Sequence, residues 1–585
     1  MFNLFLFILS TYGYVSYLEK RLAVSPYLSW ILVIAGQSLT IFVLALLNLL
    51  QPAMYLIYYL GFILLAVYLF QQSRSSQESF LDLFKRKVSW ISLIFLLTFL
   101  IWVMFMKEMP LIFWDNFSHW GLIVKFFFNE QRLATDLDKI IYYRSYPPAV
   151  SLYINYVVNF LGYSEGHMII GNFMVNLAAL YAFFTPFNIK KNKITGFLVL
   201  FLIAVFYLMD DHVKMYNLLV DNLLAYLTLA GFAGLYHYRE NRKTSSLIVI
   251  LLAGFLGLVK GSGIFFAVLV IAVYCYYLTK YDKAKAPFSL KKYLPVLLSL
   301  LPFAMWKLYV RLMYDTSQFR HSVHFDWSQL HLKAKIVAKF ILQSLDPWTP
   351  STWGLVLIVV LVLVMLLVTA REKNLQKRLM TFSGILFAVL LVYYLSTMAM
   401  YLTAMPMDEA VKLAQFDRYT LTGVFVGLGS ISLVAIKYFE SRVEDKSDYS
   451  LYGKKVIYSG LIGIYLISLA YDLVDAVIEK RNFVTDSIPY EYQKMGIDNH
   501  NLNNKKVLVL ASGKWNTDNA GNLYLYTPNT HLYKGNPDVV KKYDQILVLD
   551  NKEQTQTWVK ELTGQQLAPG FYDVKDVINE SLIQK

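Results

Sequence analysis

Long runs of apolar residues decide what this chain can fold into, more than any single motif does. A helix needs roughly 20 apolar residues with few charges to cross a bilayer, and such runs recur along the whole sequence. The pattern predicts an all-α polytopic membrane protein with about fourteen transmembrane helices. The expected spans are 2–18, 28–49, 52–70, 88–106, 167–186, 194–209, 216–237, 245–259, 263–279, 293–313, 353–369, 379–399, 418–436 and 456–476.

The composition agrees with a lipid-embedded chain. Charged residues make up 16% of the 585 residues, against about 25% in ordinary soluble proteins, and the mean hydropathy is +0.45. The net charge of +14 could indicate nucleic-acid binding, but Lys and Arg gather in short loops between apolar runs. That distribution is typical of cytoplasmic membrane loops, so no nucleic-acid partner is expected. The single cysteine, Cys275, excludes an intrachain disulfide and a cysteine-based zinc site.

The basic loops also predict the orientation of the chain. They alternate along the sequence, and all of them lie on one side if 147–162 is an interfacial helix that does not cross. By the positive-inside rule that side is the cytoplasm, which places both termini outside. The N-terminal segment lacks a basic region and a cleavage site, so we interpret it as a retained first helix.

The spans divide the chain into four regions. The last region is polar and rich in turns, and its segments KKVLVLA (505–511) and QILVLD (545–550) are expected to be buried strands. In the outer loop 314–352, the segment 331–345 shows an amphipathic helical pattern, which fits a helix on the membrane surface or one packed on neighbouring loops. The four regions are N-terminal transmembrane helices (1–106), a first large extracytoplasmic loop with interfacial helices (107–166), a transmembrane core (167–479) and a small extracytoplasmic α/β domain (480–585).

The segment FWDNFSHW in the first outer loop is the strongest candidate for chemistry. Asp115 and His119 are four residues apart, so on an α-helix they share a face, and aromatic side chains such as Trp114 and Trp120 surround them. A partly buried acid among aromatic residues could act as a general base. The alternative is a helix cap or an aromatic cluster at the membrane interface.

A second group of acids follows the span that ends at residue 209. Asp210, Asp211 and His212 are adjacent, and Asp221 lies near the outer end of the next span. Ionisable residues at the rim of a span often line an aqueous cavity, and paired carboxylates could hold a divalent cation. A solvated turn would give the same pattern.

Cations at the same membrane face complete the candidate site. Lys260 lies in a short turn between glycines, and Arg418 and Tyr419 open a later span. Both basic side chains suit phosphate binding, Lys as a point charge and Arg as a planar fork. Lys260 could instead be a snorkelling lysine, and Arg418 could form a simple ion pair with Asp417. Further positive groups on this face are Lys307, Arg311, Arg320, His321 and His324.

The order of these motifs resembles the GT-C superfamily of membrane glycosyltransferases. WDNFSHW followed by YRSYPPAVSLYINY is similar to the family's outer-loop acid and Pro-Pro helix, and YNLLVDNLLAY, LVKGSG and DRYTLTG resemble its later segments, over roughly 100–440. The likeness implies that Asp115 is the catalytic base, and His119 is a second catalytic candidate because of its spacing from Asp115. The donor phosphate would be bound by Lys260, Arg418 and Arg320, and the remaining candidates would line the acceptor pocket: Trp114, Trp120, Tyr146, Asp210, Asp211, His212, Asp221 and Tyr419.

The resemblance implies a multi-pass enzyme of a bacterial plasma membrane. Its donor would be a polyprenyl-phosphate sugar, its acceptor a cell-envelope glycan such as a polysaccharide or teichoic acid, and its other partner the lipid itself. Either no cofactor or a Mg or Mn ion is expected, with Asp115 and Asp211 as the candidate metal ligands. The sequence departs from the family in that three additional spans precede the acid. Two alternatives stay open: a ligase or polymerase that uses a pyrophosphate-linked oligosaccharide, and a transporter of lipid-linked sugar.

Overall fold

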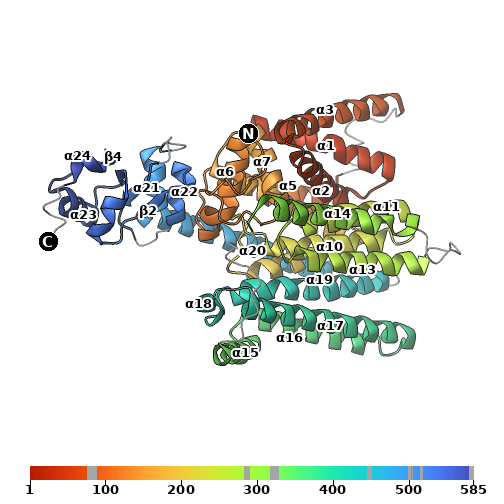
Figure 1. Ribbon diagram of the computed structural model, residues 1–585. Coiled ribbons are helices and arrows are strands. Elements are labelled where there is room, and N and C mark those ends of the chain that lie inside the picture. Colours follow the sequence, from red (N-terminus) through yellow and green to blue (C-terminus); the bar gives the residue numbers. More distant parts are fainter. Residues whose placement is uncertain are drawn as a thin grey trace.

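The computed structural model is predominantly helical and describes residues 1–75, 88–281, 290–315, 329–443, 451–497, 502, 505–513 and 518–578. Within these residues nine helices are long and apolar enough to cross a membrane. Most of them are aligned along one common axis, parallel or antiparallel to one another (Figure 1). The chain is therefore a multi-pass membrane protein. The nine are α2 (Pro26–Ala45), α3 (Leu50–Ser75), α8 with η2 (Glu165–Tyr181 and Ala182–Phe184), α13 (Gly263–Tyr281), α14 (Leu290–Met313), α16 (Pro350–Val368), α17 (Lys373–Thr403), α19 (Phe416–Val443) and α20 (Leu451–Asp486).

The other five predicted spans also fall on helical segments. Two of these helices, α5 and α9, are apolar but short, and the segment 242–257 is divided by a π-helical turn, η3. The helical positions agree with the sequence analysis, whereas the count of fourteen crossings stays a prediction. The segments are α1 (Phe2–Leu22), α5 (Trp90–Met106), α9 (Lys193–Met209), α10 (Asp221–His237) and α11–η3–α12 (Arg242–Ile248, Val249–Ala253 and Gly254–Gly257).

The loop region 107–166 folds into a π-helical turn, η1 (Asn116–Trp120), and two short helices, α6 (Gly121–Glu130) and α7 (Ala149–Leu161). With 13 residues α7 is too short to cross a bilayer. Most of its side chains, including Tyr153 and Tyr156, are enclosed by protein. Its position at the membrane interface stays a prediction. The helix packs against α2, α6 and α8, so its polar Tyr and Asn residues face neighbouring helices.

The amphipathic segment 331–345 forms helix α15 (Leu330–Leu345). Ile336 and Phe340 are buried on α17 and the start of α19, while Leu342 and Leu345 are exposed. The helix is seen nearly end-on in Figure 1, so it lies across the direction of α16 and α17 at one end of the bundle. One apolar side of the helix therefore packs on protein and the other is open, and its contact with the membrane surface stays a prediction.

The C-terminal region contains a four-stranded sheet in the order β2-β1-β3-β4. Strand β1 pairs in parallel with β2 and β3, with Leu508 opposite Ile546 in the latter pair, and β4 is antiparallel to β3. The predicted strands 505–511 and 545–550 contain β1 and β3. The elements are α21 (Ile488–Met495), β1 (Val507–Leu510), α22 (Asp518–Leu525), β2 (Thr530–Leu532), η5 (Pro537–Lys542), β3 (Gln545–Val548), α23 (Glu553–Thr563), β4 (Gly570–Asp573) and α24 (Val574–Val577).

The N-terminus and the C-terminal sheet region lie at the same end of the bundle (Figure 1). Figure 1 shows the N-terminus, the sheet region, α6 and α15 there, whereas the end of α13 and the turn between α16 and α17 lie at the opposite end. This arrangement agrees with the predicted alternation of loops. Which end faces the cytoplasm stays a prediction from the basic residues.

Candidate functional site

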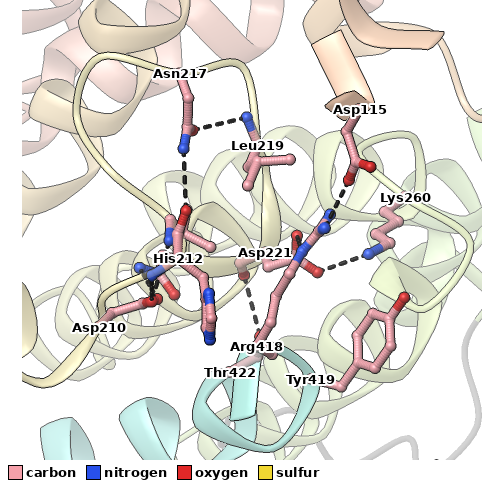
Figure 2. A network of polar contacts seen from close by, with 12 residues as sticks. Asp115, Asp210, His212, Asn217, Leu219, Asp221, Lys260, Arg418, Tyr419 and Thr422 are labelled. Carbon is pink, nitrogen blue, oxygen red and sulfur yellow. Dashed lines mark hydrogen bonds and ion pairs between the residues drawn. The ribbon is translucent and has the colours of Figure 1, made fainter. Parts of the chain in front are cut away.

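Four charged side chains from distant parts of the chain meet in one cluster (Figure 2). Arg418 Nη1 donates to Asp115 Oδ2 at 2.6 Å, and Arg418 Nε donates to Asp221 Oδ2 at 2.7 Å. Lys260 Nζ donates to the other oxygen of Asp221, Oδ1, at 2.6 Å. We call Asp115, Asp221, Lys260 and Arg418 the charged cluster. It unites three of the residues to which the sequence analysis assigned catalysis or phosphate binding.

Helix starts bring the charged cluster together. Asp221 is the first residue of α10, Arg418 lies in the first turn of α19, and Lys260 lies in the turn just before α13. Helix α10 packs against both α13 and α19, so their first turns meet. Asp115 comes from the region between α5 and α7, immediately before η1. Because the N-terminal end of a helix carries partial positive charge, three converging helix starts favour an anion at this point.

The cluster is balanced in charge and mostly buried. Two carboxylates face two cations, and the exposed fraction of the side chain is 3% for Asp221, 7% for Arg418 and 16% for Lys260. Asp115 is the most open member, at 21%. Buried charges must be paired to avoid a large desolvation cost. Arg418 uses two of its five N–H donors in the described bonds and Lys260 uses one of its three, so donors are left for a further anion.

Asp115 is held as a carboxylate. Burial alone would raise its pKa, but the guanidinium of Arg418 and the ammonium of Lys260 lower the pKa below the usual value. A side chain with these properties can accept a proton only after its pairing with Arg418 is weakened. For Lys260 the balance is reversed, since burial lowers its pKa in spite of the Asp221 carboxylate.

His119 belongs to an aromatic group beside the cluster. Its Nδ1 lies 2.6 Å from Ser118 Oγ, and its ring centroid is 4.6 Å from that of Tyr143, 5.1 Å from that of Tyr146 and 5.1 Å from that of Trp120. Burial lowers the pKa of His119 to about 3, so the imidazole is neutral near pH 7. The sequence analysis expected Asp115 and His119 to share one face of a regular α-helix. Instead, η1 is a π-helical turn, and His119 is hydrogen-bonded to its neighbour Ser118.

The other aromatic candidates lie in two places. Trp120 and Tyr146 pack together, with ring centroids 5.7 Å apart, and Tyr419 lies under Lys260, with 5.0 Å between Nζ and the ring centroid. Trp114 is 42% exposed. The rings of Trp120, Tyr146 and Tyr419 therefore combine apolar faces with polar groups near His119 and Lys260.

Asp210, Asp211 and His212 form a turn next to the cluster. Asp210 is buried and accepts hydrogen bonds from the backbone N–H groups of His212 and Val213 and from Asn222 Nδ2, at 2.7, 3.0 and 2.8 Å. Asp211 is exposed and lies 3.5 Å from Lys214, and His212 is exposed. Figure 2 shows Asp210 and His212 apart from the four charged residues. The turn interpretation therefore fits these three residues better than a role in the cluster.

A metal site finds no direct geometric support. In the part of the chain that the structure describes, no group of three His, Cys, Asp or Glu residues is arranged to hold a metal ion. The two candidate ligands engage different cations, since Asp115 binds Arg418 and Asp211 lies near Lys214. The metal role of Asp115 and Asp211 stays a prediction.

Three candidate residues fall outside the described residues. Arg320, His321 and His324 lie within 316–328, which the structure does not describe.

The sequence analysis missed a second charged group, around Lys214. Its Nζ lies 3.5 Å from Asp472 and 3.8 Å from Asp475. Oδ2 of Asp475 also accepts a hydrogen bond from the Tyr216 hydroxyl at 2.7 Å. The signal for it was present, because acids inside an apolar span such as 456–476 are rare and functional or paired.

Comparisons with family models, with curated proteins and with solved structures give no match for this chain. The likeness to GT-C enzymes therefore rests on the order of the motifs. What the structure adds is independent of that likeness: a carboxylate and two cations from these motifs lie within hydrogen-bonding distance of one another or of a shared partner.

Proposed function

We propose that this protein is a membrane glycosyltransferase that moves a sugar from a polyprenyl-phosphate donor to a hydroxyl of a cell-envelope glycan at the outer membrane face. The observation that carries the proposal is the charged cluster. Asp115 could serve as the base, and Lys260 and Arg418 could bind the phosphate. Asp221 bonds both cations and keeps them side by side.

The cations have the chemistry that a phosphodiester donor needs. Arg418 offers a planar fork of donors and Lys260 a compact ammonium, and the described hydrogen bonds leave N–H groups on both. The first turns of α10, α13 and α19 add a field that favours a negative charge. A lipid phosphate between apolar helices would keep its chain in the membrane and its head group at this end of the bundle.

In the proposed reaction an acceptor hydroxyl gives its proton to a carboxylate oxygen of Asp115 while its oxygen attacks the anomeric carbon of the donor sugar. The bond between that carbon and the phosphate oxygen breaks, and polyprenyl phosphate leaves with the electron pair. A single displacement of this kind inverts the anomeric centre. Lys260 and Arg418 would stabilise the charge that develops on the leaving phosphate, which is the interaction that accelerates the reaction most.

The ion pair between Asp115 and Arg418 suggests an order of events. Arg418 Nη1 is bonded to Asp115 Oδ2 in the structure, so the base is engaged. A donor phosphate would compete for the same guanidinium, weaken that bond and raise the proton affinity of Asp115. Donor binding would thus prepare the base before the acceptor reacts.

The acceptor would lie on the aromatic side of the cluster. Trp120 and Tyr146 provide ring faces, and neutral His119 can orient a hydroxyl through its second ring nitrogen. We assign the protein to a bacterial plasma membrane, with fourteen crossings, both termini outside and a polysaccharide or teichoic acid as acceptor class. This assignment follows from the basic loops and the motif order.

The test compares envelope glycans in cells that carry the intact chain with those in cells that carry Asp115→Asn. We expect the variant to be produced and inserted normally but to lose one sugar substituent from the envelope. A matched control is Asp408→Asn, which removes an exposed carboxylate at the start of α18 (Met407–Ala410), at the same end of the bundle. If cells with Asp115→Asn have the same envelope glycans as cells with the intact chain and cells with Asp408→Asn, Asp115 does not have the assigned role.

A further inference from the structure

We infer that Glu165 is a positioning residue, through which the C-terminal helices α21 and α22 hold the loop that carries Asp115. The C-terminal sheet region then belongs to the scaffold of the site. The importance of Asp115 rests on the proposed function, whereas the attachment of the loop is a physical claim that stands by itself.

Glu165 joins three segments that are far apart in the sequence. Its Oε2 accepts from the backbone N–H of Leu111 at 2.6 Å and from Gln493 Nε2 in α21 at 2.9 Å. Its Oε1 accepts from the hydroxyl of Tyr524 in α22 at 2.7 Å. Gln493 Nε2 also donates to the hydroxyl of Tyr524 at 2.9 Å. The three side chains therefore form a closed set of hydrogen bonds around one carboxylate.

The loop side of this contact leads directly to the site. Leu111 is buried and lies four residues before Asp115. The chain that enters the loop also lies very close to the start of α8. A Cβ atom on Gly166 would be 2.4 Å from the carbonyl oxygens of both Met106 and Lys107, which is too short for a real contact. Only glycine allows this approach. The loop therefore contacts α8 both before Pro110, at Met106 and Lys107, and after it, at Leu111.

The C-terminal side contacts the same loop at two further points. The ring of Tyr524 lies 6.2 Å from that of Phe117, which stands in η1 between Asp115 and His119. Lys125 in α6 is almost fully buried and donates to the backbone carbonyl of Leu523 at 2.8 Å. Helix α22 therefore touches η1 and α6, and Glu165 links that helix to the residues before η1.

Such support is needed because Asp115 lies at the very start of the helical run 114–130, and the residues that lead into this run are not helical. A reactive group must be held within a fraction of an ångström of its productive position, and a loop alone provides less precision than a helix or strand. Asp221, Lys260 and Arg418 are placed by the ends of packed helices. Asp115 depends instead on η1 and on the segments that contact it.

The test measures hydrogen exchange in lipid nanodiscs for the intact chain, Glu165→Ala, Glu165→Gln, Tyr524→Phe and the control Tyr526→Phe. Tyr526 follows α22 closely, but its hydroxyl bonds Glu130 at 3.1 Å and not Glu165. We expect exchange of peptide 108–120 to accelerate at least about tenfold with Glu165→Ala and less with Tyr524→Phe. Glu165→Gln keeps an acceptor for Leu111 and should restore much of the protection, while Tyr526→Phe should match the intact chain.

Helix α15, which is remote from this contact, serves as the internal reference. Unchanged exchange of 108–120 in Glu165→Ala and Tyr524→Phe would overturn the inference, and so would an equal acceleration in 330–345, because that would show general destabilisation. In a sugar-transfer assay we expect Tyr524→Phe to lower kcat about tenfold with the donor KM changed less than about twofold. If the intact chain transfers no sugar while exchange behaves as expected, the proposed function fails and the positioning role stands.

Discussion

Replacing Asp115 with Asn should abolish sugar transfer and, at the same time, strengthen donor binding. The carboxylate competes with the donor phosphate for Arg418, to which it is bonded at 2.6 Å. With Asn the competing charge is removed, while Arg418 stays oriented by Asp221 at 2.7 Å. The charged cluster changes from neutral to a net charge of +1, which favours an anion.

The size of the effect follows from the strength of the lost bond. A hydrogen bond between charged groups contributes about 1.5–3 kcal/mol, and the lower end applies because 21% of the Asp115 side chain is exposed. Since about 1.4 kcal/mol corresponds to tenfold in affinity, the Kd for the donor should fall about tenfold. Loss of the general base should lower kcat by about 10²–10⁴-fold.

Both quantities can be measured on purified protein in nanodiscs. Equilibrium binding of a radiolabelled polyprenyl-phosphate sugar gives the Kd, and transfer of the label to an acceptor glycan gives kcat. The control Asp408→Asn should match the intact chain in both. Donor binding weakened about tenfold by Asp115→Asn, or transfer retained within about tenfold, would refute the reasoning.

Three further outcomes are expected. Asp221→Asn leaves two buried cations with one carboxylate and should lower the free energy of unfolding by about 3–5 kcal/mol. Thermal unfolding in detergent measures this loss, and an unchanged midpoint would contradict the pairing. Arg418→Gln should move the acid limb of the kcat/KM profile to higher pH, because the guanidinium lowers the pKa of Asp115; an unmoved limb would contradict this. His119 has a folded pKa of about 3, below about 6.5 in an unfolded chain, so its contribution to stability is complete above pH 6.5 and is lost as the pH falls toward 3. Between pH 7 and 4.5 the intact chain should therefore lose about 2 kcal/mol more than His119→Gln, and equal losses would show that His119 is not buried in its neutral form.

The helices could be predicted from the sequence because the apolar runs are local and long. Helices such as α2 and α16 consist almost wholly of apolar residues, so hydropathy locates them directly. The enclosure of α7 by protein could not be predicted, because Tyr153, Tyr156 and Asn155 are polar enough to suggest a water-facing surface. Burial of those side chains depends on α2, α6 and α8, which no local pattern reveals.

The site was predictable in part. Asp115, Lys260 and Arg418 were placed at one membrane face from the loop order, and they do meet. Asp221 was grouped with Asp210 and Asp211 by proximity in sequence, whereas its side chain bonds Lys260 and Arg418.

Glu165 gave no signal, since GYSEGH has the pattern of an ordinary helix start, and Ser164 does cap α8 by accepting from the N–H of His167. The partners of Glu165, Gln493 and Tyr524, come more than 300 residues later in the chain. Local patterns cannot connect such distant segments.

The most direct test of the central claim is sugar transfer by sealed proteoliposomes or intact cells to an acceptor oligosaccharide that cannot cross the membrane. The donor is a labelled polyprenyl-phosphate sugar, and the measured quantity is label on the external acceptor together with an equal amount of released polyprenyl phosphate. We expect the intact chain to produce both and Asp115→Asn to produce neither. Equal labelling of the acceptor by the two proteins, or no labelling by the intact chain in the presence of bound donor, would contradict the account.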